Sequence, residues 1–142
     1  MGVKGITLSS KDDKVVGMLL IKREGTVLVA TENGFGKRTE IIQYRAQKRG
    51  GKGVLTMKTT DKIGKMITIK EVVGTDDLMI IRDDGVLIRM PVSQIRSIGR
   101  ATQGVKLIKL AEGTKVSAIT RIISEEEKTA DEPENNPEPQ DA

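Results

Sequence analysis

The chain has 142 residues, and it contains no cysteine, no histidine and no aromatic residue other than Phe35 and Tyr44. This composition excludes disulfides, thiolate metal sites and any mechanism that needs a histidine base or a cysteine nucleophile. The net charge of +4 divides unevenly: residues 124–142 hold eight acids and one lysine, a net charge of −7, which leaves +11 on residues 1–123. A basic body with an acidic tail is typical of a protein that binds a polyanion.

The first part of the chain predicts β-structure, because its apolar segments are short and rich in β-branched side chains. Strands are expected at residues 2–8, 15–21, 26–31 and about 36–43. Between the last two, Glu32-Asn33-Gly34 predicts a hairpin of type I′, since Asn-Gly tolerates the positive φ of that turn. The longest apolar run, residues 15–21, is far shorter than the ~20 residues of a membrane-spanning helix. We therefore expect no contact with a membrane.

A basic loop follows, with the sequence Gln47-Lys48-Arg49-Gly50-Gly51-Lys52-Gly53. Its glycines let a partner come close to the backbone, and its cations can donate hydrogen bonds to phosphate oxygens. Further cations, Lys37, Arg38 and Arg45, lie just upstream. The loop predicts a contact with the DNA backbone; the alternative is a glycine-rich turn whose lysines only face solvent.

The remainder of the chain repeats this plan at a spacing of 51 residues. Gly-Val recurs at residues 2, 53 and 104, and Arg38 and Arg49 recur as Arg89 and Arg100. Strands are expected near residues 53–58, 66–73, 78–82, 86–90, 104–110 and 115–123. The repeat divides the chain into unit 1 (1–52), unit 2 (53–103), a partial unit 3 (104–123) and a disordered acidic tail (124–142).

A period near 50 residues with four strands in each unit predicts an all-β, propeller-like array. Two units and part of a third cannot close a ring. Either the chain is part of something larger or it pairs with copies of itself, and we expect it to be a piece of a longer protein.

The basic loop matches the Q-[RK]-R-G-G-K-G signature of the gyrase A box at all seven positions. Together with residues 2–6, 31–39 and 99–105, it makes residues 1–123 resemble the C-terminal domain of the DNA gyrase A subunit. The order of motifs resembles the last blades of that domain. The resemblance implies a β-pinwheel with strands exchanged between blades, whose basic rim wraps double-stranded DNA and supports ATP-dependent negative supercoiling by the whole enzyme.

The resemblance also implies partners in the rest of the gyrase A subunit and in the gyrase B subunit, and a cytoplasmic, nucleoid-associated place in a bacterium. We expect no catalytic residue, no metal site and no cofactor in this chain, because ATP and magnesium would serve other parts of the enzyme. Tyr44 is expected to pack beside the loop. The predicted DNA-binding residues are Lys37, Arg38, Arg45, Gln47, Lys48, Arg49, Gly50, Gly51, Lys52, Gly53, Arg89 and Arg100.

Two alternative functions stay open on the sequence. The nearer one is a C-terminal DNA-binding domain of the topoisomerase IV type. The other is a non-enzymatic propeller scaffold whose basic face binds an acidic protein. The scarcity of aromatic residues argues against a single-strand binder, which stacks bases on aromatic rings.

Overall fold

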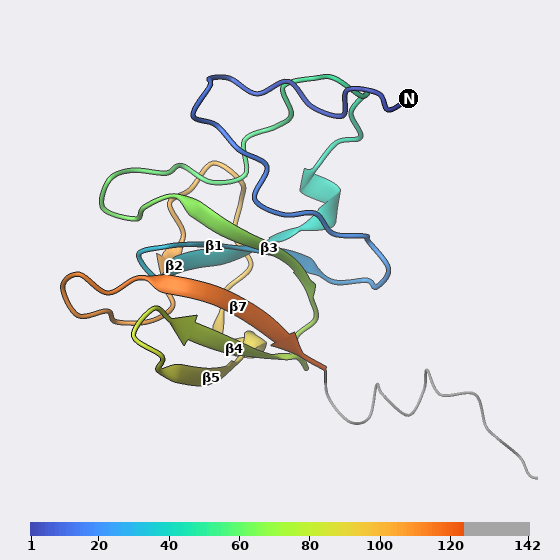
Figure 1. The fold of residues 1–142 in the computed structure, drawn as a ribbon. Helices are drawn as coiled ribbons and strands as arrows, with labels where there is room; N and C mark the ends of the chain where they lie inside the picture. Colours follow the sequence, from blue (N-terminus) through green and yellow to red (C-terminus); the bar gives the residue numbers. More distant parts are fainter. Residues whose placement is uncertain (124–142) are drawn as a thin grey trace, which may run out of the picture.

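A computed structural model describes residues 1–123, and this part of the chain consists of strands, turns and two single-turn 3-10 helices (Figure 1). The all-β prediction is confirmed. The elements are β1 (Thr26–Thr31), β2 (Phe35–Glu40), η1 (Ile41–Gln43), β3 (Met66–Val72), β4 (Asp77–Arg82), β5 (Leu87–Pro91), η2 (Val92–Gln94), β6 (Val105–Lys106) and β7 (Val116–Ile122). No helix among the described residues is long and apolar enough to cross a bilayer. The tail predicted to be disordered, 124–142, lies outside the described residues.

The strands form two sheets, with the orders β3-β1-β2-β6 and β5-β4-β7. Each sheet takes a hairpin from one repeat unit and an antiparallel neighbour from the next, because β3 pairs with β1 and β7 pairs with β4. Both of these pairings contain an irregularity at the same place, between Ala30 and Thr31 in β1 and between Ile81 and Arg82 in β4. The repeat in the sequence is therefore a repeat of sheet structure, with strands exchanged between units.

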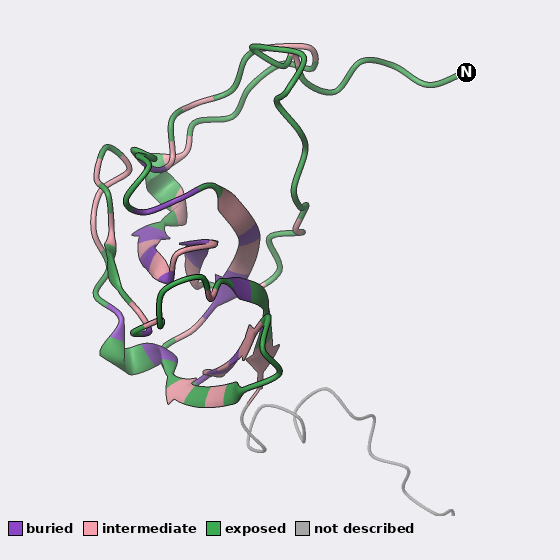
Figure 2. Cartoon of the chain, turned by 60° about the vertical axis from the view of Figure 1, so that its left-hand side comes forward, coloured by how far each residue is buried: buried purple, intermediate pink, exposed green. Residues whose placement is uncertain are grey.

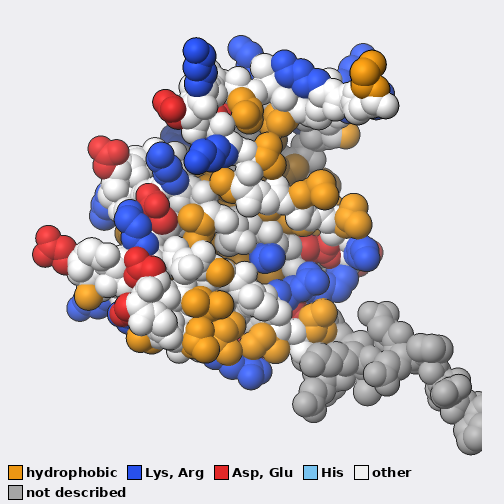
Figure 3. All heavy atoms as spheres, viewed as in Figure 1, with side chains coloured by type: hydrophobic (Ala, Val, Ile, Leu, Met, Phe, Trp, Pro, Cys, Tyr) orange, Lys and Arg blue, Asp and Glu red, His pale blue; other side chains and the backbone are white. Residues whose placement is uncertain are grey.

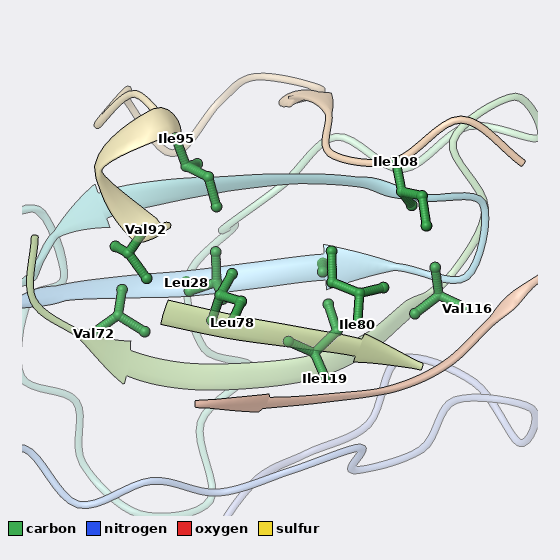
Figure 4. Packing of buried hydrophobic residues seen from close by; sticks show 10 residues of the cluster. Leu28, Val72, Leu78, Ile80, Val92, Ile95, Ile108, Val116 and Ile119 are labelled. Carbon is green, nitrogen blue, oxygen red and sulfur yellow. The ribbon is translucent and has the colours of Figure 1, made fainter. Parts of the chain in front are cut away.

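The larger hydrophobic core lies between the two sheets (Figure 4). Leu28 and Ala30 of β1 pack there with Leu78 and Ile80 of β4 and with Ile119 of β7. Burying such an aliphatic side chain contributes roughly 1.5–3 kcal/mol. The contact joins the hairpins of units 1 and 2 into one body.

A second core covers the other face of β1. Val27 and Val29, which alternate with Leu28 and Ala30, pack against Met57 and Ile63 of unit 2. A strand with both faces buried reads as a continuous apolar run, which explains the sequence Thr-Val-Leu-Val-Ala-Thr of β1. The central strand of the first sheet is thus fixed from both sides.

The hairpin between β1 and β2 is confirmed, but the predicted turn type is wrong. A type I′ turn needs positive φ at two successive residues, and no residue other than glycine has positive φ in residues 1–123. Within this turn only Gly34 has positive φ, at +85°, and its N–H donates to the carbonyl of Thr31 at 3.1 Å. A glycine at the end of a three-residue loop is the usual alternative to a two-residue turn.

Several predicted strands are wrong. Residues 2–8, 15–21 and 53–58 form no strand, and within 104–110 only Val105–Lys106 pairs. These segments are apolar enough, but a strand needs a backbone partner. None of these three segments has a strand partner among residues 1–123. The N-terminal trace is accordingly exposed along most of its length (Figure 2), with Val15, Met18 and Leu20 more than half exposed.

Candidate nucleic-acid interface

The basic loop of unit 1 is held by the segment at the start of the chain. The N–H of Gly50 donates to the carbonyl of Gly5 at 2.9 Å, and the N–H of Thr7 donates to the carbonyl of Gly51 at 2.8 Å. Gly50 and Gly53 have φ of +79° and +82°, which a residue with a side chain rarely adopts. The glycines of the loop thus set its path.

The charged side chains of this loop face solvent. Arg45, Gln47, Lys48, Arg49 and Lys52 are all exposed. Within residues 1–123, none of the four cations has an acidic side chain within 4 Å. Figure 3 shows lysine and arginine side chains along the edge of the molecule where the N-terminal segment and the loop lie side by side. Cations on an exposed edge that have no acidic partner in the described part of the chain can bind an external anion.

The equivalent loop of unit 2, residues 99–104, is held in the same way. The N–H of Lys58 donates to the carbonyl of Thr102 at 2.9 Å, and these two residues lie 51 positions after Thr7 and Gly51. Arg100 also donates from Nη1 to the carbonyl of Leu55 at 2.8 Å. Arg49, its counterpart in unit 1, has no such hydrogen bond among the described residues. The two arginines therefore occupy equivalent positions with different contacts.

Lys37 is not on the surface, which corrects its assignment as a DNA contact. Its side chain is fully buried, and its ammonium group donates to the carbonyls of Gly99 at 2.6 Å and Arg100 at 2.5 Å and to Oγ1 of Thr102 at 3.2 Å. Burial, together with the nearby charge of Arg100, lowers the pKa of Lys37 to about 8. Its three donors are thus used within the protein, where they hold the loop of unit 2 against β2.

Arg38 and Arg89 occupy equivalent repeat positions but have different surroundings. Arg38 is half-buried, its Nε donates to the carbonyl of Ile95 at 2.8 Å, and burial lowers its pKa. Arg89 is exposed and pairs with Asp77 through Nε at 2.7 Å. Arg38 thus binds a backbone carbonyl, whereas Arg89 binds a carboxylate on the neighbouring strand β4.

Two further residues complete the description. Tyr44 packs against the second core, as predicted, and its hydroxyl hydrogen-bonds to that of Thr56. Lys4, which the sequence reasoning missed, lies in the exposed segment that holds the basic loop. The repeat of Gly-Val-Lys at residues 2–4 and 104–106 was a signal that could have found it.

Among residues 1–123, no three acidic side chains converge on a point that could hold a metal ion.

The comparisons with known proteins agree with this geometry. A profile of the family described as "DNA gyrase C-terminal domain, beta-propeller" matches residues 1–22, 25–72 and 76–122. The second and third matches begin just before β1 and β4 and end with β3 and β7, so each spans a hairpin and the strand that joins it from the next unit.

Among similar proteins, the DNA gyrase A subunit of Staphylococcus epidermidis is 44% identical over 128 residues, and that of Staphylococcus aureus is 43% identical over 137. The alignments cover 89% and 95% of this chain but 14% and 15% of those proteins. The chain therefore spans about one seventh of the length of its curated relatives.

Two solved structures have the same fold. A DNA gyrase A C-terminal domain gives a TM-score of 0.79 at 24% identity, covering 86% of this chain and 41% of that one. The C-terminal domain of a DNA topoisomerase IV gives 0.74 at 20% identity, covering 84% and 38%. Because the family profile matches most of the chain, the protein belongs to the DNA gyrase C-terminal domain family of β-propellers.

Proposed function

We propose that this chain binds and wraps double-stranded DNA along its basic edge, as part of a gyrase A subunit. In this role it supports ATP-dependent negative supercoiling by the whole enzyme, whose other partners are the remainder of that subunit and the gyrase B subunit. The bacterial cytoplasm is where such an enzyme meets its DNA. The chain itself supplies a binding surface, whereas ATP and magnesium serve other parts of the enzyme.

The observation that carries the proposal is the exposed, unpaired charge of the basic loop. Lys48, Arg49 and Lys52 stand on a glycine backbone with no acidic partner among residues 1–123. Cations spaced on an exposed edge bind phosphates regardless of base sequence. The basic loop, residues 47–53, contains no aromatic residue on which a single-strand binder could stack bases. The similar proteins carry the name of a DNA gyrase, which points to the same ligand.

The test is the salt dependence of binding to a fluorescent duplex of random sequence. We expect affinity to fall steeply with salt, with a log–log slope of about −0.9 for each phosphate contacted. A variant with Lys48, Arg49 and Lys52 changed to Gln should reduce the slope by about 2 to 3. The control changes the exposed residues Lys11, Lys14 and Lys22 to Gln, which removes the same charge elsewhere. Equal slopes for the two variants would contradict the role of the loop.

A topoisomerase IV-type domain is the second candidate, because such a domain has the same fold at a TM-score of 0.74. The 44% identity to a gyrase A subunit favours gyrase. A change in plasmid linking number of constant sign would support the gyrase assignment. Binding to an acidic protein without any binding to duplex DNA would instead support the scaffold function.

A further inference from the structure

Two lysines from distant parts of the chain meet at one aromatic ring. The ammonium groups of Lys62 and Lys106 lie 6.0 and 5.8 Å from the centroid of the Phe35 ring. Each distance is within the range in which a cation is attracted by the ring quadrupole. Phe35 itself is half-buried and packs against the second core, so packing holds its ring in place.

Both lysines are held in place by the hairpin that carries Phe35. Lys106 is the register partner of Phe35 in the β2–β6 pair, and directly opposed residues share a face of the sheet. Lys62 lies in the turn between Thr60 and Gly64, and the side-chain amide of Asn33 donates to its carbonyl at 3.1 Å. Backbone pairing thus positions Lys106, and a side-chain hydrogen bond positions Lys62.

The two lysines carry positive charge that no acidic side chain neutralises in the part of the chain that the structure describes. Within residues 1–123, neither Lys62 nor Lys106 has an acidic side chain within 4 Å. Glu32, in the same hairpin, pairs with Lys115 at 3.4 Å. An anion bound beside the ring would be attracted by both ammonium groups. The geometry therefore favours a ligand with a compact negative charge.

We propose that Lys62 and Lys106, gathered on the ring of Phe35, form a second phosphate-binding site that contacts the backbone of duplex DNA. The inference rests on the proposed function, and it adds a contact outside the basic loop. Lysines bind phosphate as point charges and need no particular base beside them.

The repeat supports a place for this site on the same DNA path as the basic loop. Lys106 follows Gly104-Val105 as Lys4 follows Gly2-Val3, and Lys4 lies in the segment that holds the basic loop. Equivalent positions in a repeat array lie along one side of the array. The ring of Phe35 is an anchor for the two cations and not a platform for a base, because Phe35 is half-buried and the lysines approach its ring.

The experiment uses the duplex salt series on a double variant, Lys62→Gln with Lys106→Gln. We expect the salt slope to fall by about 1 to 2, and affinity at low salt to fall by about three- to tenfold. The matched control is Lys11→Gln with Lys14→Gln, which should change affinity less than twofold. A third variant, Phe35→Leu, keeps both charges but removes the ring. It should give an intermediate loss, because the lysines are no longer gathered.

The outcomes separate this inference from the proposed function. If the unaltered chain binds duplex DNA but the double variant has the slope and affinity of the control, the second site is wrong and the proposed function stands. If the unaltered chain fails to bind duplex DNA at low salt, both the second site and the proposed function are wrong. A calorimetric titration with inorganic phosphate tests whether the anion is instead a free phosphate ion. If the unaltered chain gives a binding heat that the double variant does not give, and the two have the same salt slope with duplex DNA, the site binds a free anion and the proposed DNA contact is wrong.

Discussion

The ammonium group of Lys37 in unit 1 lies 2.5 Å from the carbonyl oxygen of Arg100 in unit 2. A lysine in a strand next to Arg38 would normally be counted as a surface cation, yet this one is fully buried. Its contacts with Gly99, Arg100 and Thr102 join the two units at the edge of the first sheet. The loop of unit 2 is thus bound into the fold, whereas the cations of the unit 1 loop have no acidic partner within residues 1–123.

Lys37→Met should lower the free energy of unfolding by about 1–3 kcal/mol, because the buried carbonyls of Gly99 and Arg100 lose a donor. Urea unfolding measures the loss. The control is Lys58→Met, an exposed lysine that leaves the segment bound to the same loop, with an expected change within about 0.5 kcal/mol. Similar values for the two variants would contradict a structural role for Lys37.

The same lysine predicts an unusual dependence of stability on pH. Its pKa is about 8 in the folded chain against 10.5 as the reference value, so the unfolded chain binds more protons between these values. Stability therefore rises as the pH increases from about 8 to 10.5, and the buried charge lowers it below that range. The difference in unfolding free energy between the unaltered chain and Lys37→Met should grow by up to about 3 kcal/mol over this window. A flat difference curve would contradict the lowered pKa.

Gly104 tests how closely the loop of unit 2 packs against the first sheet. Its φ is +77°, and an added Cβ would lie 2.7 Å from the carbonyl oxygen of Gly36 and 2.7 Å from Cε of Met57. Gly104→Ala should therefore cost about 2–4 kcal/mol, the strain of positive φ together with overpacking.

The matched control for this substitution is Gly53→Ala, at the equivalent repeat position. Gly53 has a φ of +82°, but the nearest atom to its added Cβ, Cδ1 of Ile6, is 3.8 Å away. The control should cost only the backbone strain, about 1–2 kcal/mol. Chemical denaturation compares the two, and equal losses would show that the contact with Gly36 contributes nothing.

Asp76 and Asp77 are neighbours in sequence, but we expect them to contribute differently to the free energy of unfolding. Asp76 is fully buried and binds the guanidinium of Arg23 through both carboxylate oxygens, at 2.6 and 3.2 Å. Asp77 pairs with Arg89, whose side chain is 60% exposed. Asp76→Asn should cost about 3–5 kcal/mol, because it removes the buried negative charge that accepts both hydrogen bonds from Arg23. Asp77→Asn should cost less than about 1 kcal/mol, as exposed pairs do. Similar losses in unfolding free energy would contradict this difference.

The sequence predicts the hairpins well because their signals are local. Apolar runs ending in Glu-Asn-Gly or Asp-Asp-Gly identify β1 with β2 and β4 with β5, and the repeat identifies the second pair from the first. Residues 15–21 and 53–58 fail for a different reason. Their composition suits a strand, but pairing depends on a neighbour that composition does not describe.

The site is predicted less completely than the fold. The exposed basic loop follows from its own residues, since glycines and cations are adjacent in sequence. The burial of Lys37 depends on carbonyls more than 60 residues away, at Gly99 and Arg100. The meeting of Lys62 and Lys106 on Phe35 depends on the pairing of β2 with β6. Contacts of this kind are set by the tertiary fold, so local pattern reasoning does not reach them.

The most direct test of the account is the linking number of a nicked plasmid that is ligated while the protein is bound. A curved basic edge that wraps DNA with one hand should shift the topoisomer distribution in one direction, and the shift should grow with the ratio of protein to DNA. The variant with Lys48, Arg49 and Lys52 changed to Gln should give a smaller shift at equal occupancy. An unchanged distribution at a protein concentration that saturates the plasmid would contradict wrapping by this chain.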